Sequence, residues 1–292
     1  MEIKAALVKE LRERTGAGMM ECKRALQACA GDMEAAIQHL RKAGLAKAAR
    51  RTGKVAAEGV IVIHEMGRTA AMVEVNCETD FVAKGDEFSA FCEAVASVIL
   101  EKQPADLAAL SRLPIGSREN DTVEERQQQL AAKIGEKIAV RRFEVLSCKG
   151  IPGVYSHGSR IGVIVDLEGG EPGLAKDIAM HVAASRPVCV SEAEIPVEMV
   201  EKEKEVLIAQ AENSGKPLDI IEKMVQGRLK KFFAEVTLLG QPFVKDPEVS
   251  VSRLLKKAGA RVHSFTRYEV GEGLQKKAGN FAAEVMAQVK GA

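Results

Sequence analysis

Apolar residues recur at helical spacing over the first 45 residues, and two breaks divide them into three groups. The breaks are Thr15–Gly18 and Gly31–Asp32, where glycines and a helix-capping aspartate interrupt the spacing. The apolar positions are Ile3, Leu7, Val8 and Leu11 in the first group, Met19, Met20, Leu26 and Cys29 in the second, and Met33, Ile37 and Leu40 in the third. The pattern therefore predicts a compact module of three short helices.

A strand and a helix follow, joined by a short connection. Alternation over Ala71–Cys77 predicts a strand whose valines face one side while Glu74 and Asn76 face the other. Apolar residues at helical spacing then predict a helix over roughly residues 87–100. Residues 78–84, with the sequence Glu-Thr-Asp-Phe-Val-Ala-Lys, connect the two. A strand-to-helix connection is a common place for functional side chains.

Two interpretations of this connection are open. In the local one, Thr79 caps a single helical turn, Asp80 lies at the positive end of that turn, and Phe81 packs inward before Gly85 ends it. In the functional one, the acid and the aromatic side chain are presented to a partner. The spacing alone favours the local interpretation.

The rest of the chain contains an internal repeat. Copy one has strand patterns at residues 59–65, 68–77 and 138–145, and copy two has them at residues 153–157, 160–167 and 261–270. The third strands share a pattern, Arg-Phe-Glu-Val at Arg142–Val145 and Arg-Tyr-Glu-Val at Arg267–Val270. Each copy also has a helix pattern after its second strand. We therefore predict an α+β fold in which each copy forms a small antiparallel sheet with covering helices.

The repeat supplies an internal comparison for the connection. At the equivalent corner, copy two has the glycine-rich residues 168–173 in place of Thr79–Lys84. A sequence needed only for folding would be expected in both copies. The difference favours a task for Asp80 and Phe81 beyond the fold.

Copy two carries a long insertion before its third strand. Residues 198–212 and 218–236 predict two helices that pair as a protruding antiparallel helical hairpin. A last amphipathic helix is predicted at residues 281–289. The expected domains are residues 1–54 for the three-helix module and a basic, alanine-rich linker, residues 55–149 for core subdomain N, residues 150–273 for core subdomain C with the helical hairpin at 191–236, and residues 274–292 for a carboxyl-terminal helical module.

The composition argues against several classes of protein. The 42 basic and 41 acidic residues give a net charge of +1, without the basic excess of a nucleic-acid binder. No apolar run reaches membrane-spanning length, and the amino terminus opens into an amphipathic helix without a signal peptide. The six cysteines contain no CxxC pair, which suits reduced thiols. We expect a cytoplasmic protein with no membrane partner and no specific nucleic-acid partner.

An enzymatic site finds little support. Cys77 beside Glu78 could pair with His157 or His181 as a nucleophile and its base. However, Cys77 ends a strand on the apolar side, and His181 lies on a helix between apolar neighbours, as a core histidine would. The five histidines show no metal-ligand spacing. We therefore expect neither catalysis nor a metal site nor a cofactor.

Direct nucleotide binding is not expected either. The pair Gly53-Lys54 would belong to a phosphate-binding loop only with Gly in place of Ala48 and Ser or Thr in place of Val55.

Several motifs in order along the chain resemble the elongation factor Ts family. They are Leu11–Met20 with Cys22 and Lys23, Thr79–Lys84 with the sequence Thr-Asp-Phe-Val-Ala-Lys, His181–Ser185, and Gly240–Phe243. The resemblance implies a guanine nucleotide exchange factor that binds elongation factor Tu in its GDP-bound and nucleotide-free states. It also implies a three-helix module like a ubiquitin-associated domain, and contacts between molecules through the helical hairpin.

The resemblance assigns roles to particular residues. The segment that disturbs the partner's Mg²⁺ site would be Asp80, Phe81, Val82 and Ala83. The other partner contacts would be Met19, Met20, Lys23, Thr79, Lys84, Ile134 and His157. Independently of the family, Met19 and Met20 are adjacent on a helix, so both cannot face the module's core.

The alternative function is an RNA- or ribosome-binding module that uses the basic linker and the helical hairpin. Lys47, Arg50, Arg51 and Lys54 supply the positive charge of the linker. No aromatic residues are interspersed among them, so a solvated tether is the favoured interpretation of this segment.

Overall fold

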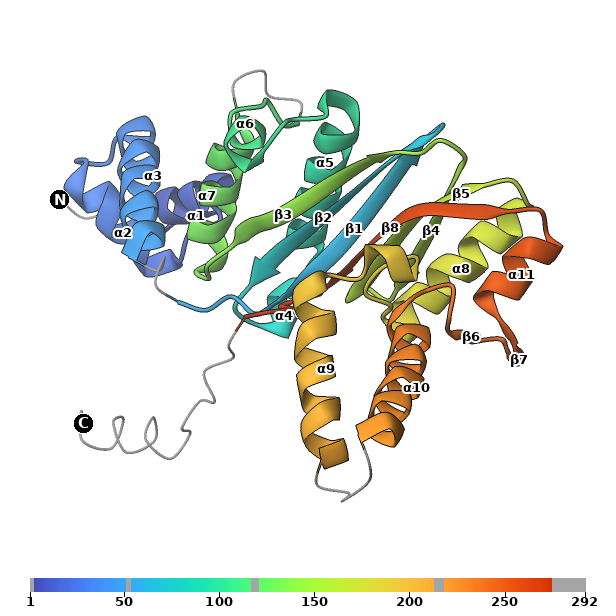
Figure 1. Ribbon diagram of the computed structural model, residues 1–292. Helices are drawn as coiled ribbons and strands as arrows, with labels where there is room; N and C mark the ends of the chain where they lie inside the picture. Colours follow the sequence, from blue (N-terminus) through green and yellow to red (C-terminus); the bar gives the residue numbers. More distant parts are fainter. Residues whose placement is uncertain (1–2, 51–53, 117–120, 213–217, 275–292) are drawn as a thin grey trace. The chain divides into compact units, whose positions relative to one another are not determined.

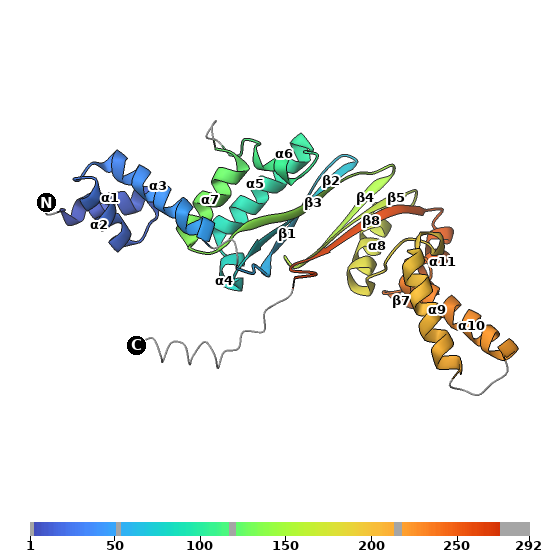
Figure 2. The ribbon, with the colours of Figure 1, turned by 60° about the vertical axis from the view of Figure 1, so that its left-hand side comes forward.

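A computed structural model describes residues 3–50, 54–116, 121–212 and 218–274 of the chain. It contains two compact units (Figures 1 and 2). The first is formed by the described parts of Met1–Val62, Val73–Phe143 and Val270–Ala292. The second is formed by those of Ile63–Met72 and Glu144–Glu269.

The predicted three-helix module is present. Its helices are α1 (Ala5–Thr15), α2 (Met19–Ala28) and α3 (Met33–Arg50). Leu11, Cys22 and Leu26 form its core with other apolar side chains. The structure differs from the sequence interpretation at the linker, because α3 continues through Gly44 to Arg50. Alanine, leucine, lysine and arginine are strong helix formers, and a single glycine among them does not end a helix.

The first sheet has the strand order β1 (Glu58–Met66), β2 (Thr69–Cys77) and β3 (Ala139–Ser147). After β2 come the single turn α4 (Asp80–Ala83) and the helix α5 (Asp86–Lys102). Every residue of β2 from Ala70 onward is buried, as expected for a central strand covered on both faces. Glu74 and Asn76 are therefore buried as well.

Copy one also has an insertion before its third strand, between α5 and β3, and it is partly helical, which the sequence analysis did not predict. It contains α6 (Leu107–Ser111) and α7 (Val123–Ile134). Thr122 and Glu125 cap α7 reciprocally, since the Thr122 Oγ1 accepts the Glu125 N–H at 3.2 Å and the Glu125 carboxylate accepts the Thr122 N–H at 3.0 Å. Within the first unit, α7 packs against α3.

The second sheet is antiparallel and has the order β4 (Ile151–His157), β5 (Ile161–Glu168) and β8 (Arg261–Glu269). Helix α8 (Pro172–Ser185) packs on β4 and β5. A Cβ at Gly153 of β4 would lie 2.3 Å from the Ala175 carbonyl oxygen of this helix, so only glycine permits the approach.

The predicted helical hairpin is formed by α9 (Val197–Glu212) and α10 (Leu218–Val236), whose seam contains Leu207, Ile221 and Val225. Before it lies a short 3₁₀ turn at Glu192–Glu194. After it, the chain forms three elements that the sequence analysis did not predict: β6 (Pro242–Phe243), β7 (Asp246–Ser250) and α11 (Val251–Lys257).

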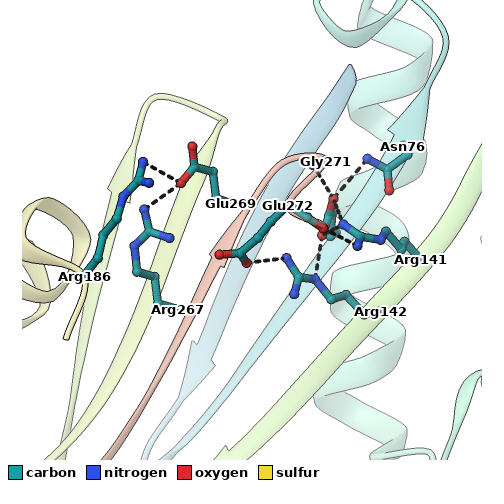
Figure 3. A network of polar contacts seen from close by, with 9 residues as sticks. Asn76, Arg141, Arg142, Arg186, Arg267, Glu269, Gly271 and Glu272 are labelled. Carbon is teal, nitrogen blue, oxygen red and sulfur yellow. Dashed lines mark hydrogen bonds and ion pairs between the residues drawn. The ribbon is translucent and has the colours of Figure 1, made fainter. Parts of the chain in front are cut away.

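A buried carboxylate in the first unit holds the chain just after β8. The Glu74 carboxylate pairs with Arg141 at 3.0 Å and with Arg142 at 2.6 Å (Figure 3). It also accepts the Gly271 N–H at 2.8 Å and the Asn76 amide at 3.0 Å. Burial alone would raise the pKa of Glu74, but these hydrogen bonds together hold it below its usual value. Glu74 is therefore ionised at neutral pH and fully compensated.

A second group of the same composition lies in the second unit. The Glu269 carboxylate pairs with Arg186 at 2.8 Å and with Arg267 at 2.8 Å (Figure 3). Unlike that of Glu74, its side chain is 30% exposed. The Glu74 carboxylate is thus fully buried, whereas the Glu269 carboxylate is partly open to water.

The predicted α+β class with small antiparallel sheets is confirmed. The domain limits at residues 54, 149 and 273 stay predictions. The last helix, predicted at residues 281–289, lies outside the described residues, as does the turn of the hairpin at 213–217. Within the described part of the chain, we find no helix with the length and apolar character needed to cross a membrane.

Candidate partner-binding site

The connection after β2 is a capped helical turn. Thr79 is its N-cap residue, and the Thr79 Oγ1 accepts the Val82 N–H at 3.4 Å. Gly85 follows as the N-cap of α5. The cap that the local interpretation predicts is therefore confirmed.

Phe81 does not pack inward. Its side chain is 83% exposed, the highest exposed fraction among the large apolar side chains of the described residues. That part of the local interpretation is wrong. Thr79 caps the turn, and the ring, which lies mostly in water, contributes little to holding it. The ring is therefore accessible to a partner in the free chain.

Asp80 presents a negative charge beside this ring. Its carboxylate accepts a hydrogen bond from the Lys84 ammonium at 2.9 Å, one helical turn later. This hydrogen bond holds the pKa of Asp80 below its usual value. The acid is consequently ionised at neutral pH. Both side chains remain exposed, and a surface pair of this kind is readily exchanged for another partner.

Glu136 anchors the turn from the segment that follows α7. The Glu136 carboxylate accepts the Thr79 hydroxyl at 2.7 Å and the Thr79 N–H at 3.0 Å. The sequence analysis missed this residue. Its neighbour Ile134 was a predicted contact residue, but nothing in the spacing relates residue 136 to residue 79.

The other predicted contact residues lie on separate elements. Met19, Met20 and Lys23 are exposed on α2, and the two methionines are 55% and 63% exposed. The sequence analysis expected at least one of these adjacent methionines to lie outside the module's core, and both do. Ile134 is the last residue of α7 and is half-buried.

His157 ends β4 in the second unit. Its side chain is exposed, and its Nδ1 lies 3.2 Å from the Tyr155 hydroxyl. Tyr155 itself packs against the core of that unit. The predicted contact residue is thus held by an aromatic neighbour two positions earlier on the same strand.

Cys77 and His181, which were considered for catalysis, are both buried. Burial, together with the nearby Glu136 and Glu58 carboxylates, raises the pKa of Cys77 to about 12, which makes its thiol a poor nucleophile at neutral pH. His181 is buried and lies 3.0 Å from the Gln241 amide oxygen. Burial lowers the pKa of His181, so it stays neutral. It is the satisfied core histidine that the sequence suggested.

Comparison with known proteins identifies the family. The family model described as elongation factor TS matches residues 78–272. Elongation factor Ts of Thioalkalivibrio sulfidiphilus is 58% identical over the full length of both chains. The chain belongs to the elongation factor Ts family. The proteins of that name from Alkalilimnicola ehrlichii, 57% identical over the full length of both chains, and Legionella pneumophila, 56% identical over 99% of both, agree.

Membership in the elongation factor Ts family gives the chain a role in translation elongation. The family match begins at Glu78, directly before the turn that carries Asp80 and Phe81, and it includes Ile134 and His157. The helices with Met19, Met20 and Lys23 precede it, but the full-length relatives cover them. The resemblance noted in the sequence is confirmed.

Proposed function

We propose that this chain is a guanine nucleotide exchange factor for elongation factor Tu. It binds the GDP-bound partner, disturbs the Mg²⁺ and phosphate site, and promotes GDP release so that GTP can bind. The observation that carries the proposal is the aromatic ring of Phe81, 83% exposed on a capped turn beside the ionised Asp80. Family membership supports the choice of partner.

The two side chains would act on different parts of the partner's site. A GTP-binding protein holds its nucleotide through backbone amides around the phosphates, a lysine and Mg²⁺. The Phe81 ring would insert between elements of the partner and separate them. The Asp80 carboxylate would compete with the arrangement that holds Mg²⁺. Loss of the metal removes charge compensation from the phosphates, and GDP then dissociates faster.

The remaining proposed contacts extend the interface. Met19, Met20 and Lys23 would bind through the exposed face of α2, where the flexible methionines adapt to a partner surface. Val82 and Ala83 would belong, with Asp80 and Phe81, to the segment that disturbs the partner's Mg²⁺ site. Thr79 and Lys84 would add contacts beside it, and Ile134 and His157 would add contacts from α7 and β4. This distribution over several elements would let the partner bind tightly while one short segment disturbs its nucleotide.

The chain would act by binding alone, in the cytoplasm. We propose no catalytic residue, no cofactor and no nucleotide site of its own. The alternative of RNA binding through the basic linker receives little support, because the one linker cation whose side chain the structure describes, Lys54, pairs with Glu78 at 3.1 Å.

Thermodynamic linkage provides a test of this function. If the chain weakens GDP binding to elongation factor Tu, GDP must weaken binding of the chain by the same ratio. We expect titrations of elongation factor Tu with the chain, in the presence and absence of GDP, to differ by the factor by which the chain changes the GDP dissociation constant. Equal affinity of the chain for the GDP-bound and nucleotide-free partner would contradict the proposal.

A further inference from the structure

Thr79 is bonded at each of its polar groups. Its N–H and its hydroxyl donate to Glu136, at 3.0 and 2.7 Å. Its hydroxyl oxygen also accepts the Val82 N–H, and its carbonyl oxygen accepts the Cys77 thiol at 3.2 Å. The raised pKa of Cys77 keeps that thiol protonated, so it remains a donor. The residue that begins the turn therefore has one orientation that satisfies all its groups.

The contact between the two segments is reciprocal. The Glu136 carboxylate also accepts the Glu78 N–H at 3.1 Å, while the Glu78 carboxylate accepts the Lys137 N–H at 2.8 Å. Lys54 donates to the Glu78 carboxylate, and the Lys137 ammonium donates to the Lys54 carbonyl oxygen at 2.9 Å. Two neighbouring carboxylates thus hold the backbone of each other's segment, with lysines supplying the opposite charge.

The turn needs such support. Helix α4 has only four residues, and a single helical turn is unstable by itself, because its first hydrogen bond must order several residues. Phe81 contributes little to holding it, since its ring lies in water. Asp80 and Lys84 form only an exposed pair within the turn. The hydrogen bonds of Glu78 and Thr79 tie the start of the turn to the segment after α7.

We propose that Glu136 is a positioning residue for the exchange activity. Its carboxylate holds Glu78 and Thr79, so that the turn is already formed and Asp80 and Phe81 are already oriented before the partner arrives. This inference rests on the proposed exchange function. A preformed turn avoids the entropy of ordering the chain during binding, which strengthens binding without any contact from Glu136 itself.

The test compares two carboxylates, Glu125 in the first turn of α7 and Glu136 just after its end. Glu136→Ala removes the three bonds to residues 78 and 79, whereas Glu125→Ala removes a carboxylate that caps α7 in a similar way. We expect Glu136→Ala to reduce stimulated GDP release from elongation factor Tu about tenfold, a loss comparable to ordering one or two side chains on binding. Glu125→Ala should remain within about twofold of the wild-type rate. Equal losses in the two variants would overturn the proposal.

Repeating the Glu136→Ala change in a chain that lacks the Asp80 and Phe81 side chains separates a positioning role of Glu136 from direct contact with the partner. If Glu136 acts only through the turn, Glu136→Ala should have less than about a twofold effect in a chain that already carries Asp80→Ala and Phe81→Ala, since coupled residues are not additive. The same tenfold loss in both backgrounds would show that Glu136 acts elsewhere, and it would overturn the positioning role.

Hydrogen exchange tests the anchor without any partner. In Glu136→Ala, we expect faster exchange of the Glu78, Thr79 and Val82 amides and unchanged protection along β2. Loss of protection throughout β2 would indicate general destabilisation and contradict the proposal. If the wild-type chain failed to stimulate GDP release, the proposed function would be contradicted. The pattern of amide hydrogen exchange would still decide whether Glu136 holds the turn.

Discussion

Phe81→Ala is expected to slow the GDP release that this chain stimulates from elongation factor Tu by about thirtyfold or more. A buried aromatic anchor at an interface contributes roughly 2 kcal/mol or more, which corresponds to about that factor. The ring is exposed in the free chain, so its removal should change the free energy of unfolding by only about 0.5 kcal/mol. The measurement is stopped-flow release of a fluorescent GDP, with thermal unfolding of the same variant.

Met66→Ala is a matched control. Met66 is another large apolar side chain in water, 61% exposed at the end of β1, and no role in exchange is proposed for it. Its loss should leave GDP release within about twofold of the wild-type rate. A Phe81→Ala variant that unfolds several kcal/mol more easily, while its folded fraction exchanges normally, would show that the ring is structural.

The largest loss of stability is expected from Glu74→Ala. This change leaves Arg141 and Arg142 without their buried partner and the Gly271 N–H without its acceptor. Removing one member of a buried ion pair costs about 3–5 kcal/mol, and the lower end applies because both arginines are partly exposed. Chemical denaturation followed by circular dichroism would measure it, since the chain has no tryptophan for fluorescence.

The half-buried group of the second unit controls for the loss of charge. Glu269→Ala also removes a carboxylate that pairs with two arginines, but Glu269 is 30% exposed and its partner Arg186 is 62% exposed. Because Arg267 is only 8% exposed, the loss should exceed that of a surface pair, yet it should stay below that of Glu74→Ala. Similar losses of stability in the Glu74→Ala and Glu269→Ala variants would mean that burial of Glu74 is not the cause.

Lowering the pH should reduce the stability that Glu74 contributes to the fold. The pKa of Glu74 is lowered in the folded chain from its ordinary value of 4.5. Its contribution to stability is therefore complete above about pH 4.5 and is lost as the pH falls through the folded-state pKa. Glu74→Gln should accordingly make the free energy of unfolding less dependent on pH below that value.

The elements and the repeat could be predicted because they depend on local spacing. Strand patterns located the strands of the two three-stranded sheets but not β6 and β7, and the two copies share the pattern of Arg142–Val145 and Arg267–Val270. The structure extends this likeness. Asp166 of the middle strand β5 is buried and accepts the Lys149 and Gly150 N–H groups just after β3, as Glu74 of the middle strand β2 accepts a backbone N–H just after β8.

The helix α7 could also have been found from the sequence. Thr122 is followed three residues later by Glu125, which is the capping-box pattern of a helix start. The sequence analysis assigned no element between the helix pattern of residues 87–100 and the strand pattern of residues 138–145, although this local signal was present.

Other features could not be predicted because they depend on partners distant in the sequence. The alternation of β2 placed Glu74 and Asn76 opposite the valines, but it did not reveal that this second face is covered too. The arginines that neutralise Glu74 follow it by 67 and 68 residues. Glu136 is likewise 57 residues from Thr79. No periodicity connects such pairs.

The candidate site was partly predictable. The pattern identified Thr79 as a cap but left open whether Phe81 packs inward or faces a partner. The comparison between the two copies favoured a partner, and the exposed ring agrees with that interpretation.

GDP release from elongation factor Tu with and without Mg²⁺ tests the central claim most directly. Trace amounts of the wild-type chain should accelerate release of a fluorescent GDP, and Asp80→Ala should slow this effect in the presence of Mg²⁺. When Mg²⁺ is removed beforehand, the step assigned to the acid is already complete, so the difference between the two chains should shrink. No acceleration by the wild-type chain, or an equal deficit of Asp80→Ala with and without Mg²⁺, would contradict the account.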